Sequence, residues 1–111
     1  NLIGQYVQVK SNGIEIAGQP GRTIRASADG TVLYSGNQVT GYGELIIIDH
    51  GQGFMSTYAH NRRLLVKQGD QVRSGEKIAE MGSSEADRTK LHFEIRKGEK
   101  PVDPLAYLPR R

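Results

Sequence analysis

Clusters of turn-forming residues interrupt this chain at short intervals and limit what it can fold into. Glycine, serine, asparagine and aspartate gather at 35–37, 41–43, 51–53, 68–70, 74–75 and 82–84. The segments between these clusters alternate apolar with polar residues, and several are rich in β-branched and aromatic side chains. Only 105–108, closed by Pro109, reads as a helical turn. The sequence therefore predicts an all-β fold, with strands at about 2–10, 31–35, 44–50, 54–60, 77–81 and 90–97.

The length and the apolar runs bound the architecture. The 111 residues are enough for one hydrophobic core and too few for two, so residues 1–111 are expected to form a single domain. The longest clear apolar run, 45–48, is far shorter than the roughly 20 residues that cross a bilayer. Any export signal or lipid anchor is expected upstream of Asn1, because no apolar leader is present.

Composition excludes some kinds of active site and favours some classes of partner. The absence of cysteine excludes disulfides, thiol catalysis and cysteine-based zinc sites. A formal charge of +3 favours anionic partners such as cell-wall polymer or an acidic protein face. No stretch of lysine and arginine is interleaved with stacking aromatic residues, so nucleic acid is not expected as a partner.

Three motif-like segments follow one another along the chain, at 11–15 (SNGIE), 58–60 (YAH) and 90–94 (KLHFE). They resemble, in the same order, the H-x-G-x-D, Y-A-H and H-x-H-F-E motifs of the LytM/lysostaphin-type zinc endopeptidases. The resemblance implies an antiparallel β-sheet domain with a duplicated hybrid motif and a groove over the sheet.

Residues 66–79 carry the cadence V-x-x-G-D-x-V-x-x-G-x-x-I-A of a tightly turned hairpin. Biotinyl and lipoyl carrier domains share this cadence with the lysostaphin-like endopeptidases. A carrier needs an exposed lysine at the tip of the hairpin, usually beside methionine, and neither Lys67 nor Lys77 has that setting. The endopeptidase resemblance is therefore the preferred interpretation.

The zinc-site positions of the family are only partly kept. By resemblance, Ser11, Glu15 and His92 stand at the three ligand positions, and His60 and Lys90 at the two remaining histidine positions. A catalytic zinc normally needs three protein ligands and an open water position. Serine is a poor ligand, glutamate displaces the oxygens of aspartate, and the lysine ammonium repels a cation. No metal, cofactor or catalytic residue is therefore expected, and Glu15 is a candidate to pair with Lys90 instead.

Members of the family without metal ligands resemble activators of cell-wall amidases, of the NlpD and EnvC kind. The sequence of this chain is more similar to the NlpD kind, in segments 58–61, 64–66, 87–88, 91–96 and 100–105. The resemblance implies binding of a zinc-dependent N-acetylmuramoyl-L-alanine amidase through the vacated groove, relief of its autoinhibition, and splitting of septal peptidoglycan during cell separation. The expected groove residues are Ser11, Glu15, Tyr42, Tyr58, His60, Arg88, Lys90, His92 and Arg96.

Two residue types give this groove its expected character. Tyr42 stands between two glycines that suit a tight turn, so its ring is expected to project toward a partner. Arg88, Lys90 and Arg96 are expected to make the rim positive and to favour an acidic partner segment.

Two other functions stay open on the sequence. One is a peptidoglycan-binding module that activates nothing, and the other is a residual zinc endopeptidase. The resemblance places the chain in the periplasm of a Gram-negative bacterium, as the C-terminal domain of a longer exported protein. Such a protein is a candidate for tethering to the outer membrane by an upstream lipid anchor, while this domain itself is not expected to contact the membrane.

Overall fold

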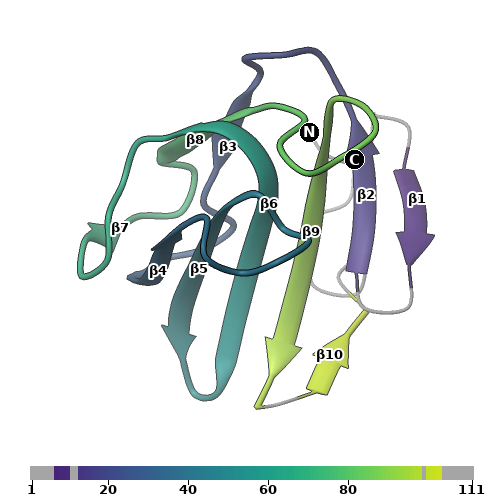
Figure 1. Ribbon diagram of the computed structural model, residues 1–111. Helices are drawn as coiled ribbons and strands as arrows, with labels where there is room; N and C mark the ends of the chain where they lie inside the picture. The colour runs from purple at the N-terminus through teal and green to yellow at the C-terminus, as the bar shows by residue number, and fades with distance from the viewer. Residues whose placement is uncertain (1–6, 11–12, 99, 104–111) are drawn as a thin grey trace.

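A computed structural model describes residues 7–10, 13–98 and 100–103, and within these ranges the fold consists of strands without a helix (Figure 1). None of the described segments is a long apolar helix of the kind that crosses a membrane. The ten strands are β1 (Val7–Lys10), β2 (Gly13–Ala17), β3 (Thr23–Arg25), β4 (Gly30–Gly36), β5 (Glu44–Gly51), β6 (Phe54–Leu64), β7 (Gln71–Val72), β8 (Lys77–Met81), β9 (Lys90–Lys97) and β10 (Lys100–Val102).

All of the strand pairs are antiparallel, and β6 connects them. The main order is β1-β2-β9-β6-β5-β4-β7, with β10 beside β9 and β3 beside β8. The first part of β6 pairs with β5 and β9, while its end, from Asn61 to Leu64, pairs with β8. A register shift between Asn61 and Arg63 accompanies this exchange of partners. Strand β6 is therefore shared by the part of the sheet that contains β5 and β9 and the part that contains β8 and β3.

Most of the predicted strands are found. Strands β8 and β9 have the predicted bounds, and β4 and β5 extend the predicted ranges by one residue at one or both ends. The structure adds β2, β3, β7 and β10, which the sequence did not indicate as separate strands, and it extends β6 beyond the predicted 54–60 to Leu64. Of the predicted strand 2–10, only 7–10 are described, and the predicted helical turn 105–108 lies outside the described residues.

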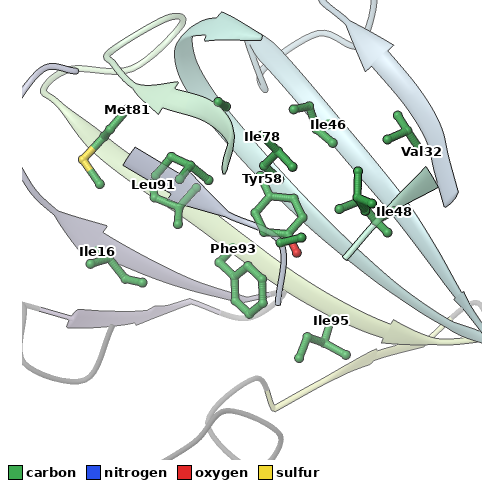
Figure 2. Close-up of a cluster of buried hydrophobic side chains, with 14 of the residues drawn as sticks. Ile16, Val32, Ile46, Ile48, Tyr58, Ile78, Met81, Leu91, Phe93 and Ile95 are labelled. Atoms are coloured by element: carbon green, nitrogen blue, oxygen red, sulfur yellow. The ribbon is translucent and has the colours of Figure 1, made fainter. Parts of the chain in front are cut away.

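The core is built from isoleucines and two central aromatic rings. Figure 2 shows Tyr58 beside Phe93, and their ring centroids lie 5.3 Å apart. Isoleucines of five different strands surround this pair, including Ile16, Ile46 and Ile78, each at most 1% exposed. Burial of this kind contributes about 1.5–3 kcal/mol for each large apolar side chain. The sheet thus packs its strands around one continuous apolar cluster.

Tyr58 is part of this core, so its predicted place in a groove is wrong. The side chain is only 1% exposed. Its hydroxyl accepts a hydrogen bond from the backbone N–H of Ser27 at 2.9 Å and lies 2.7 Å from Ser56 Oγ. Burial raises the pKa of the Tyr58 hydroxyl, against the opposing effect of these hydrogen bonds. The ring is a core residue with a satisfied hydroxyl and offers no surface to a partner.

Candidate functional site

Successive side chains of β9 point alternately to the core and to the candidate site. Leu91, Phe93 and Ile95 face the core and are at most 8% exposed (Figure 2). The residues between and beside them point to the opposite face, because successive side chains of a strand alternate. These site residues are Lys90, His92, Glu94 and Arg96.

Lys90 forms an ion pair with the neighbouring strand. Its Nζ lies 2.9 Å from Glu15 Oε1 on β2 and 3.4 Å from Asp87 Oδ1 in the loop before β9. The pairing of Glu15 with Lys90 that the sequence indicated is therefore confirmed. Burial lowers the pKa of Lys90, but the contacts with Glu15 and Asp87 outweigh it and raise the pKa above its ordinary value. The ammonium group is held in its charged form.

His92 lies between two carboxylates. Its Nε2 donates a hydrogen bond to Glu94 Oε2 at 2.8 Å, and its Nδ1 lies 3.3 Å from Glu15 Oε2. The second contact lacks hydrogen-bond geometry, so the buried Nδ1 has no hydrogen-bond partner. The pairing of β2 with β9 places Glu15 directly opposite His92 and so explains this approach. His92 is 6% exposed and cannot leave the cluster without moving its neighbours.

Glu94 is the acceptor at the centre of the site. It is 1% exposed, and its Oε2 accepts a hydrogen bond from the Tyr42 hydroxyl at 3.0 Å. Its Oε1 accepts one from Arg96 Nε at 3.1 Å. Burial raises the pKa of Glu94, but the hydrogen bonds from His92, Tyr42 and Arg96 outweigh it and hold the pKa below its usual value. Sequence reasoning did not include Glu94 among the groove residues, although its spacing of two from His92 and Arg96 places it on their face.

Tyr42 covers the site instead of projecting from it. Gly41 and Gly43 have φ of +91° and +63°, which confirms the predicted tight turn. The turn directs the ring across the sheet, so that its centroid lies 6.0 Å from that of His92. Burial and the neighbouring Glu94 raise the pKa of the Tyr42 hydroxyl, which therefore acts as a donor. Tyr42 is partly buried.

His60 is fixed beside Tyr42 by its backbone and its ring. Its N–H donates to the carbonyl of Tyr42 at 2.9 Å, and its Nδ1 donates to the carbonyl of Ser84 at 2.8 Å. Its φ of +69° is uncommon for a residue other than glycine. Burial lowers the pKa of His60, and nearby Lys90 and His92 add to this effect, while the bond to Ser84 opposes it. The lowered pKa favours the neutral ring.

Two loops join above the sheet and enclose these side chains. The N–H of Gly41 donates to Glu85 Oε1 at 2.9 Å, and the N–H of Glu44 donates to Ser84 Oγ at 3.0 Å. Ser84 Oγ in turn donates to the carbonyl of Asn61 at 2.6 Å. The β4–β5 loop and the β8–β9 loop are thereby tied to each other and to β6. His60, His92 and Glu94 are buried beneath them.

Gly13 allows the close approach of β2 to β9. A Cβ at this position would lie 2.4 Å from the carbonyl oxygen of Phe93 and 2.9 Å from Cγ of Glu94. The backbone contact cannot be relieved by a rotamer change, so we expect Gly13→Ala to lower the free energy of unfolding by about 2 kcal/mol. Urea denaturation measures this loss. The control is Ala17→Gly, which changes a residue of the same strand without adding an atom. Gly51→Ala is unsuitable as a control, because Gly51 has a φ of +85° that disfavours any other residue.

The structure brings together six of the nine predicted groove residues, namely Glu15, Tyr42, His60, Lys90, His92 and Arg96. Arg88 is exposed in the adjacent loop, Tyr58 belongs to the core, and Ser11 lies outside the described residues.

The expected positive rim is wrong in one respect. Lys90 is paired with Glu15 and Asp87, and Arg96 is paired with Glu94 at 3.1 Å. Three carboxylates thus stand beside the three cations Arg88, Lys90 and Arg96, so the site presents both signs of charge.

The zinc ion of active endopeptidases does not fit the described side chains. The ammonium of Lys90 lies 2.9 Å from Glu15 Oε1, so one oxygen of this carboxylate is already paired with a cation of the chain. A second cation within a few ångströms of this ammonium would be repelled. Within 13–98 and 100–103, no group of three or more histidine, aspartate or glutamate side chains is arranged to hold a metal.

Comparison with known proteins gives both family and relatives. The model of peptidase family M23 matches residues 9–104. A lipoprotein NlpD/LppB homolog of Pseudomonas aeruginosa is 57% identical over 99% of this chain and 38% of its own length. The murein hydrolase activator NlpD of Escherichia coli is 52% identical over 91% of this chain and 27% of its own length. This chain therefore spans well under half of these relatives.

Among solved structures, the catalytic domain of lysostaphin from Staphylococcus simulans superposes with a TM-score of 0.88. The match covers 96% of this chain and 93% of that domain at 21% identity, a level at which the likeness shows the fold alone. The predicted all-β, antiparallel domain of the lysostaphin type is confirmed.

Proposed function

Because this chain belongs to peptidase family M23 yet carries a lysine–glutamate ion pair in place of a metal site, we propose that it is a non-catalytic activator of a cell-wall hydrolase. The ion pair between Lys90 and Glu15 is the observation that carries this proposal. It occupies the centre of the site with a cation that belongs to the chain. The site can therefore hold a shape and a set of hydrogen bonds, but it has no means of activating a water molecule through zinc.

The names of the relatives support the choice of partner. The Escherichia coli relative is named a murein hydrolase activator. The hydrolase proposed here is a zinc-dependent N-acetylmuramoyl-L-alanine amidase that is autoinhibited until the activator binds. By this proposal the chemistry is done by the amidase, while this chain supplies only binding energy. The outcome would be the splitting of septal peptidoglycan and the separation of daughter cells.

The accessible parts of the site define the proposed contact. Asp87 has a side chain that is 79% exposed, and Arg88 next to it is exposed as well. The side chain of Arg96 is 33% exposed, and Tyr42 is partly exposed. These four residues form a rim around the buried histidines and Glu94. Tyr42 and Arg96 are held in place by hydrogen bonds to Glu94, which suits docking because less conformational entropy is lost when a partner binds.

The names of the relatives also support a location. The Pseudomonas aeruginosa relative is named a lipoprotein, which supports a place in the envelope of a Gram-negative bacterium. We place the domain in the periplasm, as part of a longer protein tethered through a lipid anchor. The amidase and peptidoglycan would both be within reach there.

Dye release from labelled sacculi tests the activator proposal. Sacculi carrying a covalent dye are incubated with purified amidase, with this chain, or with both. We expect release only from the mixture. We further expect Arg88→Glu to reduce the stimulation by about tenfold, because it reverses an exposed charge at the docking rim. Lys67→Glu, an equal charge change in the β6–β7 loop, is expected to keep the stimulation.

Three results would contradict the proposal. Equal loss of stimulation in the Lys67→Glu control would show that net charge, not the rim, is responsible. No stimulation by the unchanged chain would leave a binding module that activates nothing. Release by this chain alone, together with stoichiometric zinc that survives dialysis, would establish an endopeptidase instead.

A further inference from the structure

A second charged surface lies on the outer side of the three-stranded unit formed by β3, β8 and the end of β6. Residues directly opposite one another on antiparallel strands point to the same face. Ile24, Ala79 and Leu64 are paired in this way across the three strands and face the core. Glu80, next to Ala79 in β8, therefore points outward together with its partners Thr23 and Arg63. A register shift after Ile24 leaves Ile78 buried and places Lys77 opposite Arg25, and both of these residues are exposed.

Four cations and one carboxylate share this outward face. Glu80 on β8 is paired with Arg63 on β6, and Lys77 is paired with Arg25 on β3. Arg62, at the register shift of β6, reaches Glu80 with its Nε at 3.1 Å. The four cations Arg25, Arg62, Arg63 and Lys77 are named the basic face below.

Glu80 shows that the basic face accommodates a carboxylate. One of its oxygens accepts the bond from Arg62, and the other lies 3.6 Å from Lys77 Nζ. The hydrogen bond from Arg62 is the main cause of the lowered pKa of Glu80, and charge attraction from Lys77 and Arg63 adds to it. The side chains of Arg62 and Lys77 remain 54% and 44% exposed. Their outer surfaces are open to a further anion.

The basic face carries a local excess of positive charge. Its four cations stand against the single carboxylate of Glu80, which leaves three positive charges. Such an excess attracts an anionic polymer.

We propose that the basic face binds the carboxylates of peptidoglycan peptide stems. Guanidinium groups match carboxylates in geometry, and the basic face offers three of them in adjacent strands. The name of the Escherichia coli relative, a murein hydrolase activator, favours this polymer over other anions. This surface goes beyond the proposed function and does not require a hydrolase. It begins two residues after His60 in β6, so polymer held here would lie next to the site proposed to dock the amidase.

Sedimentation of this chain with purified sacculi, in the absence of any amidase, tests the proposal. We expect the unchanged chain to pellet with sacculi, and the bound fraction to fall as salt is added, because exposed charges are screened. The double variant Arg63→Glu/Lys77→Glu is expected to bind at least about tenfold more weakly. Lys67→Glu/Lys100→Glu makes the same change in charge on the β6–β7 loop and on β10, and it is expected to retain binding.

A third variant changes binding in the opposite direction. Glu80→Gln removes the carboxylate that competes for Arg62 and Lys77, so we expect it to bind sacculi more tightly, by a few fold. A variant that merely unfolds the domain cannot strengthen binding. Circular dichroism confirms that each variant is folded.

The outcomes separate this inference from the amidase proposal. Unchanged binding by Arg63→Glu/Lys77→Glu, or weaker binding by folded Glu80→Gln, overturns the basic face as the polymer site. Binding to vesicles of phosphatidylglycerol but not to sacculi overturns peptidoglycan as its ligand. Because the assay contains no amidase, dye-release results have no bearing on it.

Discussion

Replacing Glu94 with alanine is expected to lower the free energy of unfolding by about 4 kcal/mol, within the range for removing one member of a buried ion pair. The carboxylate is 1% exposed and accepts hydrogen bonds from Tyr42, His92 and Arg96. Alanine would leave these three donors without their acceptor beneath two closed loops. Guanidinium denaturation at neutral pH measures the loss.

The matched control is Asp87→Ala, which removes a carboxylate whose side chain is 79% exposed. It is expected to leave the free energy of unfolding nearly unchanged, because an exposed ion pair contributes little. Equal losses in the two variants would contradict a central role for Glu94.

Acid should remove the contribution of Glu94 in a defined direction. Its pKa in the folded chain lies below the ordinary value of 4.5, so the unfolded chain takes up this proton first as the pH falls. The stabilisation is therefore present above pH 4.5 and is lost as the pH falls through the folded pKa. The difference in stability between the unchanged chain and Glu94→Gln should shrink over that range. A difference that grows in acid would show the opposite sign of linkage.

Replacing Lys90 with methionine is expected to lower the free energy of unfolding by about 3 kcal/mol, the lower end of the range for breaking a buried pair. The lower end applies because the side chains of Lys90 and Glu15 keep 14% and 13% of their surface exposed. Methionine keeps most of the length of the lysine side chain but leaves Glu15 without its ammonium partner. Thermal unfolding followed by circular dichroism gives the loss.

A double-mutant cycle with Glu15→Gln separates the pair from its surroundings. We expect the double variant to lose less stability than the sum of the two single changes, with a coupling of about 2 kcal/mol. Strict additivity would mean that the 2.9 Å contact contributes no interaction energy.

The fold was predictable where strands carry their own pattern. Strands β8 and β9 alternate or cluster apolar residues between clear turn signals, and both were predicted with their bounds. Strands β3 and β7, of three and two residues, are too short to show a period. They are strands because of their partners: β3 pairs with β8, more than fifty residues later in the sequence. Such pairing depends on contacts that local propensity does not encode.

The ion pair of the site was predictable from the sequence, whereas the burial of Tyr58 and Glu94 was not. The motif positions made Glu15 a candidate to pair with Lys90, and the 2.9 Å contact confirms this pairing. Tyr58 was misplaced because β6 is central and covered on both faces, with Ser56 to Asn61 all buried. Alternation then no longer distinguishes inside from outside. Glu94 was overlooked because its partner Tyr42 lies 52 positions away in the sequence.

Every copy of this protein carries the ammonium of Lys90 from translation onward, because this cation is a side chain and not a bound ion. A domain organised around a bound metal is a two-component assembly, so its folded fraction depends on the free concentration of that metal. Here the cation that joins β2 to β9 is covalently part of the chain. We therefore expect metal starvation that empties a zinc enzyme to leave the amount of this folded domain unchanged.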